Sequence, residues 1–214
     1  MLSSWKDRLN TRRGALLVFL VLLGAMSAVF SYPEVLFQRP DGHHLWRQSD
    51  CLSLAQGYMA PESRFLEGTM HYLGADGSGQ SMSDLPVIYW SVGRIWRFTG
   101  REEAVYRALV LLFFYMGITA LFLTMREMLA DGLLAALLTL LLFSSPMVAY
   151  YANNFLMNMP ALGLVLMGWW AVAVHLRNGR HGPLLLALSL FTLAGALKAS
   201  ASLSLIAVLA IGAI

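Results

Sequence analysis

The sequence predicts an all-α, polytopic membrane protein with about six membrane spans. Two observations lead to this fold class. Hydrophobic residues make up 58% of the 214 residues and charged residues only 13%, which lies outside the range of ordinary soluble domains. The apolar residues also gather in long runs separated by short polar turns, a pattern typical of transmembrane helices. We therefore expect residues 1–214 to form a single transmembrane domain.

The first predicted span covers residues 14–32 and follows four basic residues, Lys6, Arg8, Arg12 and Arg13. Because basic residues are retained on the cytoplasmic side of a span, this pattern places the N-terminus in the cytoplasm. A cleaved signal peptide is the alternative, since a basic start and an apolar middle also fit one. No small-x-small cleavage pattern leads into Tyr32-Pro-Glu34, so an uncleaved span is the preferred interpretation.

Residues 33–102 are expected to form a long exported loop with two juxtamembrane helices at the membrane interface. These helices are predicted over 43–59 and 85–98, where apolar and aromatic residues alternate with polar and basic ones. The glycine-rich patch 74–80 lacks the GKS/T ending of a phosphate-binding loop. It is therefore predicted to be a flexible loop.

The rest of the chain is nearly all membrane, with spans expected over 104–125, 132–149, 156–176, 183–197 and 200–214. With the N-terminus in the cytoplasm, Arg126 and the Arg177/Arg180 turn fall on the cytoplasmic side, in agreement with the positive-inside rule. The loop 33–102, the connection 150–154 and Lys198 then share the exported face. Because the chain ends within an apolar run, we expect it to be the N-terminal part of a longer protein.

The densest group of ionisable side chains is Asp41-Gly-His-His-Leu-Trp-Arg-Gln-Ser-Asp50, directly after the first span. Charged groups beside lipid are costly, so this group is the first candidate site. A polar crevice at the bilayer edge suits a substrate with a lipid tail, such as a polyprenyl-phosphate sugar. A carboxylate, Asp50 or Asp41, could activate an acceptor hydroxyl. The cations that could hold the phosphate are His44, Arg47, Arg94 and Lys198.

Each of these residues also has a purely structural interpretation. Asp41 is a suitable helix N-cap, and Arg47 and Asp50 have the i, i+3 spacing of a helix-surface ion pair. Arg94 could attract anionic lipid headgroups, and Lys198 could extend along apolar surface to the interface. Gly163 and Gly168 indicate close helix packing. A divalent cation is compatible with the chemistry, but no metal-ligand spacing indicates one, and no motif indicates nucleic-acid binding.

The stretch His44-Leu-Trp-Arg-Gln-Ser-Asp50 resembles the H-x-W-R-Q-x-D pattern of a bacterial group of membrane glycosyltransferases of the GT-C superfamily. That group is similar to the dolichyl-phosphate-mannose protein mannosyltransferase and aminoarabinose transferase families. Weaker matches follow in the same order. They are Asp84-Leu-Pro86, the G-x-x-E-x-x-x-R stretch Gly100–Arg107, the segment Met157–Ala161, and Leu197-Lys198. Asn158 stands where many of these proteins have Asp.

The resemblance implies sugar transfer from a polyprenyl-phosphate-linked donor to a cell-envelope acceptor at the outer face of the bacterial inner membrane. It implies an essential acid in the first exported loop, which the match places at Asp50, with Asp41 second. Arg47 and His44 would orient the acid or hold the donor phosphate, which Lys198 would also meet. Gln48 would hydrogen-bond a substrate, and Asp84 would shape the acceptor side. The alternatives are a transporter or flippase for a lipid-linked substrate and a non-catalytic membrane subunit.

Overall fold

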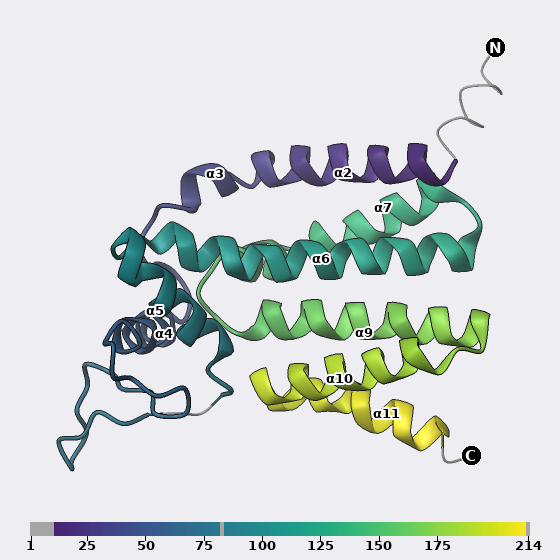
Figure 1. The fold of residues 1–214 in the computed structure, drawn as a ribbon. Coiled ribbons are helices and arrows are strands. Elements are labelled where there is room, and N and C mark those ends of the chain that lie inside the picture. Colours follow the sequence, from purple (N-terminus) through teal and green to yellow (C-terminus); the bar gives the residue numbers. More distant parts are fainter. Residues whose placement is uncertain (1–10, 82–83, 213–214) are drawn as a thin grey trace.

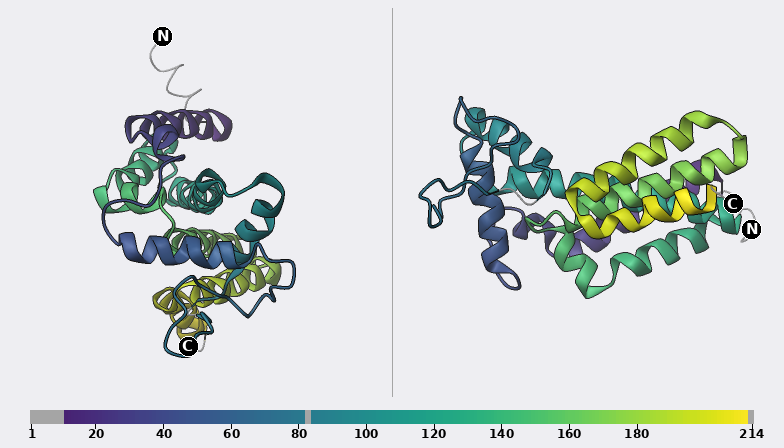
Figure 2. Two further views of the ribbon diagram at one scale, coloured as in Figure 1. Left: turned by 90° about the vertical axis from the view of Figure 1, so that its left-hand side faces the viewer. Right: turned by 90° about the horizontal axis from the view of Figure 1, so that it is seen from below.

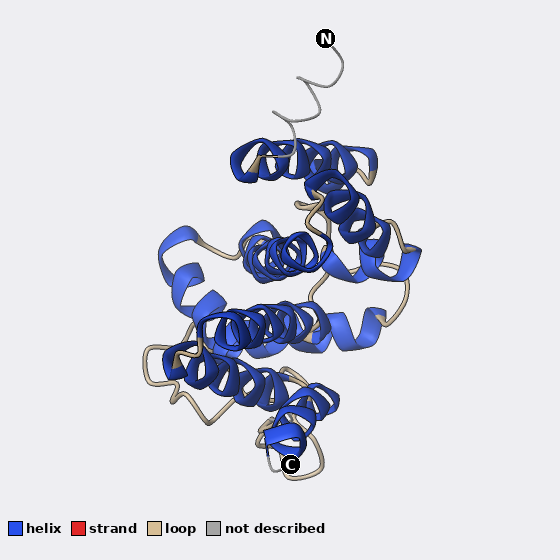
Figure 3. Cartoon of the chain, turned by 90° about the vertical axis from the view of Figure 1, so that its right-hand side faces the viewer, coloured by secondary structure: helices blue, strands red, loops and turns tan. Residues whose placement is uncertain are grey.

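The computed structural model describes residues 11–81 and 84–212, and every regular element within them is helical (Figures 1 and 3). The all-α prediction is therefore confirmed for this part of the chain, where a single bridge between Thr69 and Gln80 is the only strand-like pairing. Lys6 and Arg8, two of the basic residues before the first predicted span, lie outside the described residues. The elements in order are α2 (Arg12–Val29), α3 (Tyr32–Val35), α4 (Leu45–Gly57), α5 (Val87–Thr99), α6 (Glu103–Leu129), α7 (Gly132–Phe143), α8 (Pro146–Ala152), α9 (Asn158–Asn178), α10 (His181–Leu197), the 3-10 turn η1 (Ala199–Ala201) and α11 (Ser202–Gly212).

The long helices form a bundle, and α4 and α5 lie across one of its ends (Figures 1 and 2). Within the bundle α6 packs against α7 and α9, α2 packs against α7, and α10 packs against α9 and α11. We call the end that carries α4 and α5 the α4/α5 end. The connections α6–α7 and α9–α10 lie at the opposite end.

Two helices, α6 and α9, are long and apolar enough to cross a membrane. A third span results if α7 and α8 are counted together, and three shorter apolar helices cover Arg13–Val29, His181–Leu197 and Ala199–Gly212. Of the six or so spans expected from the sequence, the described helices therefore support two or three. The span predicted over 132–149 is not one straight helix, because α7 and α8 are bent by 77° at a break. The break has a local cause: Pro146 is in the first turn of α8, and proline cannot continue a preceding helix.

The bundle core depends on a close crossing of α6 and α9. A Cβ atom added to Gly117 would overlap the backbone of Gly163, and one added to Gly163 would overlap the carbonyl of Phe113. Gly168 is likewise covered by the ring of Phe191 on α10. The predicted packing role of Gly163 and Gly168 is therefore confirmed, since only glycine allows backbones to approach this closely.

The two helices predicted in the 33–102 region are present as α4, which begins and ends two residues inside the predicted 43–59, and α5, which begins two residues and ends one residue later than the predicted 85–98. They pack on each other where Gly93 meets the backbone of Ala55 and Tyr58. The buried Trp96 of α5 donates a hydrogen bond from Nε1 to the carbonyl of Glu102, 2.8 Å away, and so attaches α5 to the start of α6. The glycine-rich patch is a loop as predicted, with positive φ at Gly74, Gly77 and Gly79.

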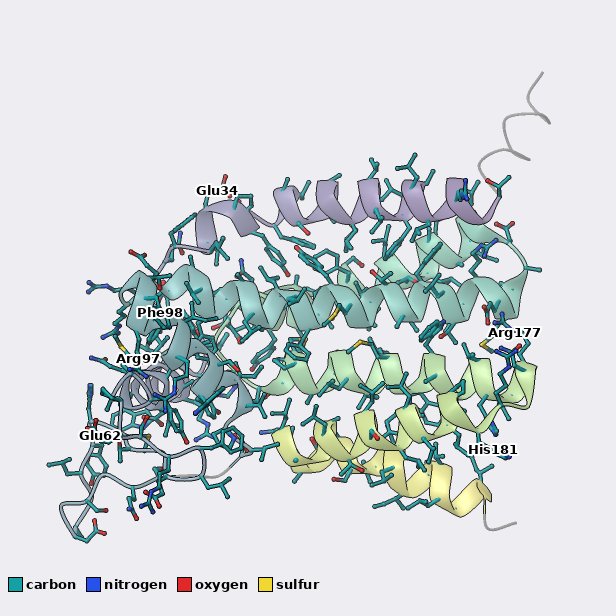
Figure 4. The ribbon with its side chains drawn as sticks, viewed as in Figure 1. Glu34, Glu62, Arg97, Phe98, Arg177 and His181 are labelled. Atoms are coloured by element: carbon teal, nitrogen blue, oxygen red, sulfur yellow. The ribbon has the colours of Figure 1, made fainter. Side chains whose placement is uncertain are left out.

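Charged side chains lie mainly at the two ends of the bundle. Figure 4 shows Glu62 and Arg97 at the α4/α5 end and Arg177 and His181 at the opposite end. At the opposite end Arg177 pairs with Glu127, which joins the α9–α10 turn to the end of α6. The apolar surface between the ends is the part of the molecule that could lie in a bilayer.

Candidate functional site

Three hollows at the α4/α5 end contain most of the predicted site residues. The Lys198 pocket, about 140 Å³, is lined by His44, Arg47, Cys51, Asp84, Tyr89, Tyr151, Asn158 and Lys198. The Arg107 cavity, about 330 Å³, is lined by Asp41, Gln48, Arg107, Tyr150, Asn153 and Asn154, with Phe30, Val35 and Ala149 as apolar members of the lining. The Asp50 groove, about 760 Å³, includes Trp46, Asp50, Gln56, His71 and Arg101.

The first turn of α4 separates the Lys198 pocket from the Arg107 cavity. Arg47 lines the first and Gln48 the second, because neighbouring residues on a helix face directions about 100° apart. The residue before the helix, His44, has φ 59°, an uncommon conformation for a residue other than glycine. The two histidines then face different rings: His43 lies 6.1 Å from Tyr150 and His44 lies 6.0 Å from Tyr151, measured between ring centroids.

In the Lys198 pocket a cation and a carboxylate form a direct ion pair. Arg47 Nη2 donates to Asp84 Oδ2 over 3.1 Å, and Tyr89 OH donates to the same oxygen over 3.4 Å. The Asp84 side chain is 16% exposed and that of Arg47 is 45% exposed. The other carboxylate oxygen, Oδ1, accepts no hydrogen bond from the residues that the structure describes. Asp84 Oδ1 is therefore available for a further hydrogen bond.

Lys198 reaches the same pocket because the chain breaks there between α10 and η1. Its backbone is extended, with φ −154° and ψ 111°, so the two apolar helices do not form one continuous rod. The Leu85 amide donates to the carbonyl of Ala196 over 2.9 Å, which holds the residue after Asp84 beside the end of α10. Asn158, exposed at the first position of α9, completes this wall. Four separate segments thus supply one polar pocket.

The charges of this pocket influence one another. Burial disfavours the charged form of the Arg47 guanidinium, but Cys51, Tyr89, Asp84 and Asp50 together raise its pKa above the ordinary value. Burial raises the pKa of the Cys51 thiol to about 11, although its hydrogen bond with Tyr89 and the charge of Arg47 act in the opposite direction. Arg47 is consequently a permanent cation, and Cys51 is a neutral thiol at physiological pH.

An apolar groove of about 510 Å³ lies on α10 close to the Lys198 pocket. We call it the α10 groove, and it is lined by Leu85, Leu185, Leu188, Ser189, Thr192, Leu193 and Ala196. Its two hydroxyl groups donate to carbonyls one turn earlier on the same helix, Ser189 to Leu185 and Thr192 to Leu188. The groove therefore presents a mainly hydrocarbon surface that runs along the bundle away from the α4/α5 end.

In the Arg107 cavity a buried guanidinium contacts carbonyl groups. Arg107 is 4% exposed and donates to the carbonyls of Asn153, Gln38 and Arg39, the last two over 3.3 and 3.4 Å. Its guanidinium carbon also lies 4.2 Å from the ring centroid of Phe155. Arg107 forms no ion pair within residues 11–81 and 84–212, and the carboxylate one turn earlier, Glu103, pairs with Arg101.

The structure places the remaining predicted site residues apart from the Lys198 pocket. Asp50 is half-buried in the Asp50 groove beside Trp46 and Arg101. Gln48 is 1% exposed, and its Nε2 donates to the carbonyls of Asp41 and His43 and to the Tyr150 hydroxyl. Through these contacts Gln48 stabilises the start of α4. The sequence predicted that Gln48 binds a substrate.

Two structural interpretations from the sequence need correction, and Arg94 lies apart from the other predicted site residues. Asp41 is not the N-cap of α4, since that position belongs to His44 and the Asp41 carboxylate accepts from the amide of Gly42. Arg47 pairs with Asp84, so the predicted surface pair with Asp50 does not form. Arg94 donates to the carbonyls of Ala60 and Ser63 and so attaches the loop after α4 to α5. Arg94 lines none of the three hollows.

Several residues of the site were not identified from the sequence. Arg107, Asn153 and Asn154 are each less than 5% exposed and line the Arg107 cavity. One signal was available for Arg107, an arginine inside an otherwise apolar span, which marks a functional candidate by the cost of burying its charge. Tyr89 gave no such signal, because aromatic residues are common at membrane interfaces.

Among the described residues no group of three or more His, Cys, Asp or Glu side chains could hold a metal ion. No family model, curated protein or solved structure matches this chain.

Proposed function

We propose that this chain acts as a glycosyltransferase that moves a sugar from a polyprenyl-phosphate-linked donor to a cell-envelope acceptor. The observation that carries the proposal is the Lys198 pocket. There two cationic side chains, Arg47 and Lys198, line the same pocket as the carboxylate of Asp84, which pairs with Arg47, at the polar end of a bundle of apolar helices. Such a site suits a substrate that is a phosphate ester at one end and hydrocarbon at the other.

The donor fits the combination of the Lys198 pocket and the α10 groove. Charge-assisted hydrogen bonds from Arg47 and Lys198 would hold the phosphate and stabilise the negative charge that develops as it leaves. Leu85 lines the α10 groove and directly follows Asp84, so the pocket and the groove are adjacent. The polyprenyl chain would lie along this hydrocarbon surface, where burial of apolar area favours binding.

The transfer step requires a base for the acceptor. The oxygen of the acceptor hydroxyl attacks the anomeric carbon, the bond between that carbon and the phosphate oxygen breaks, and its electron pair stays with the phosphate. The hydroxyl proton passes to a carboxylate. The geometry favours Asp84 for this role, because its Oδ1 is free and it lies among the cations. The sequence resemblance favours Asp50, so the two carboxylates are rival candidates.

The distribution of basic residues supports an outward-facing site in a bacterial inner membrane. Arg126 lies at the end of α6 and Arg177 at the end of α9, both opposite the α4/α5 end. The short loops there fit the cytoplasmic side by the positive-inside rule. The α4/α5 end, with the Lys198 pocket, then faces the exported side, where acceptors of the cell envelope are found.

The experiment measures sugar transfer by the full chain in membranes, using a panel of polyprenyl-phosphate-linked pentoses and hexoses. The double variant Arg47→Gln/Lys198→Gln removes both pocket cations and should lower transfer by about 10²-fold or more, on the scale known for loss of charge-stabilising donors. The matched control is Arg97→Gln, an exposed arginine of α5 that lies outside the three hollows and should leave transfer unchanged.

Two outcomes would contradict the proposal. If no donor of the panel supports transfer by the wild-type chain, the result favours a non-catalytic subunit. If a lipid-linked sugar crosses the membrane intact, without transfer to an acceptor, the result favours a flippase. Equal losses in the double variant and the Arg97→Gln control would point to non-specific effects of charge and would remove the Lys198 pocket from its role.

A further inference from the structure

The Arg107 cavity contains polar groups that the fold itself does not satisfy. Arg107 Nε, Asn154 Nδ2 and Asn153 Oδ1 are buried and have no hydrogen-bond partner among the described residues. All three residues are at least 95% buried and line the cavity. Buried donors without acceptors are uncommon, and each costs free energy until a partner is supplied. Two of these three atoms are N–H donors.

Arg107 also lacks an ion-pair partner within the described residues, although Asp41 and a second arginine, Arg39, line the same cavity and Glu103 acts on Arg107 from one turn away. Arg107 remains a cation because a guanidinium does not lose its proton in proteins. Its contacts within the described chain are carbonyl oxygens and an aromatic face, which carry no net charge. A buried charge normally has a counter-ion, since removing it from water is expensive. An anion in the cavity would supply both the missing charge and the missing acceptors.

The shape and lining of the cavity indicate the kind of anion. Its volume of about 330 Å³ lies at the lower end of the range for small-molecule sites and exceeds what one small ion fills. Phe30, Val35 and Ala149 add apolar groups to the same lining as Arg107 and Asn154. The lining therefore matches an oxyanion that carries an organic substituent.

We propose that the Arg107 cavity is a second anion-binding site, which takes a phosphate-type oxyanion through Arg107 and Asn154. The site is distinct from the Lys198 pocket, because Gln48 and Tyr150 line one and Arg47 and Tyr151 line the other. Binding to it does not rest on the proposed sugar transfer. The oxyanion can come from a lipid headgroup or from free phosphate, and the apolar groups of the lining favour the lipid.

The test is the melting temperature of the full chain purified in neutral detergent. One arm adds inorganic phosphate against chloride at equal ionic strength. The other adds dihexanoyl phosphatidic acid against dihexanoylglycerol, which has the same tails without the phosphate. At a hundredfold excess over Kd the wild type should melt roughly 5 °C higher with a ligand that binds only the folded chain. A rise with phosphatidic acid alone identifies a lipid headgroup, a rise with phosphate alone identifies the free anion, and a rise with both identifies the shared oxyanion.

Two variants connect the effect to the cavity. Arg107→Gln removes the cation, and Val35→Trp fills part of the cavity while keeping Arg107. Either variant should raise the half-saturating ligand concentration by about tenfold or more, the size expected for losing one charge-assisted hydrogen bond. The matched controls are Arg97→Gln and the double variant Arg47→Gln/Lys198→Gln, which should retain the full rise in melting temperature.

The proposal is overturned if neither phosphate ligand raises the melting temperature, or if dihexanoylglycerol raises it as much as phosphatidic acid. It is also overturned if the rise survives both Arg107→Gln and Val35→Trp, or if it is lost only in the Lys198-pocket double variant. Should Arg107→Gln fail to fold, Val35→Trp decides alone, because it leaves every hydrogen bond of Arg107 in place.

Discussion

The Lys198 pocket and the Arg107 cavity share a wall, but their arginines differ in exposure and in bonding partners. In the pocket Arg47 is 45% exposed and faces the carboxylate of Asp84. In the cavity Arg107 is 4% exposed and faces carbonyl groups from three residues. The first arginine can exchange its partner for a substrate at little cost, because ion pairs in partly exposed positions contribute little to stability. The second arginine joins the segment after α3 to the end of α8 and start of α6.

This difference indicates that two cations at the same end of a bundle can have separate roles, one in chemistry and one in stabilising the fold. Changes in the Lys198 pocket should affect chemistry and leave the fold intact. Changes in the Arg107 cavity should affect the fold first, since removing Arg107 leaves the buried carbonyl of Asn153 and the partly buried carbonyls of Gln38 and Arg39 without this donor. The following predictions test that division, beginning with the largest expected effect.

The first prediction concerns the three candidate carboxylates. Asp84→Asn should lower sugar transfer by about 10²- to 10⁴-fold, because an amide cannot accept the acceptor's proton. Asp50→Asn and Asp41→Asn should each lower it less than about tenfold, since their carboxylates lie in other hollows. The measurement is kcat for transfer, together with the melting temperature, which should be nearly unchanged in all three variants.

The reverse ranking would transfer the base to Asp50, as the sequence resemblance implies. In that case the Asp50 groove, which Arg101 also lines, would become the reaction site. The two arginines would then still differ in structural role, but Arg47 would have no role in sugar transfer.

The second prediction compares the two arginines directly by stability. Arg107→Ala should lower the free energy of unfolding by about 3 kcal/mol, because it leaves buried carbonyls unpaired and removes the contact with Phe155. Arg47→Ala should lower it by no more than about 1 kcal/mol, the range of partly exposed ion pairs. Reversible unfolding in mixed micelles measures both. Equal losses would show that the two arginines contribute equally to the free energy of unfolding.

The third prediction uses Cys51, the single cysteine of the chain, as a reporter of the Lys198 pocket. With its pKa raised to about 11, the thiol should hold roughly 100-fold less thiolate at pH 8 than one of ordinary pKa, because each pKa unit is a factor of ten. Alkylation by iodoacetamide, followed by mass spectrometry, should be correspondingly slow and should rise with pH up to about 11.

Arg47→Gln extends this prediction with a definite sign. The Arg47 charge lowers the Cys51 pKa, so its removal should raise that pKa further and slow alkylation at pH 8. Arg97→Gln is the control and should leave the rate unchanged. Faster alkylation in Arg47→Gln would mean that the variant opens the pocket to solvent, and Arg47 would then have the structural role assigned only to Arg107.

Much of the site was predictable because single residues carry strong local signals. His44, Arg47, Asp84, Asn158 and Lys198 were all selected from the sequence, and all line one pocket. Charged or polar residues beside apolar runs are costly, so they mark functional positions without any knowledge of the fold. The N-cap role of Asp41 and the pairing of Arg47 with Asp50 failed for a different reason. Both assumed a local partner, whereas Arg47 found a better one 37 residues away in Asp84.

The sequence by itself determined the class of protein, because the excess of apolar residues leaves only a bundle of helices with polar ends as a stable arrangement. It did not determine where every helix breaks, since the span expected over 132–149 includes Pro146, where α8 begins after a 77° bend. Only the tertiary structure decided which polar residues share a hollow. That choice depends on the close crossing at Gly117 and Gly163 and on the extended backbone at Lys198, which together set how segments far apart in the chain meet at one end.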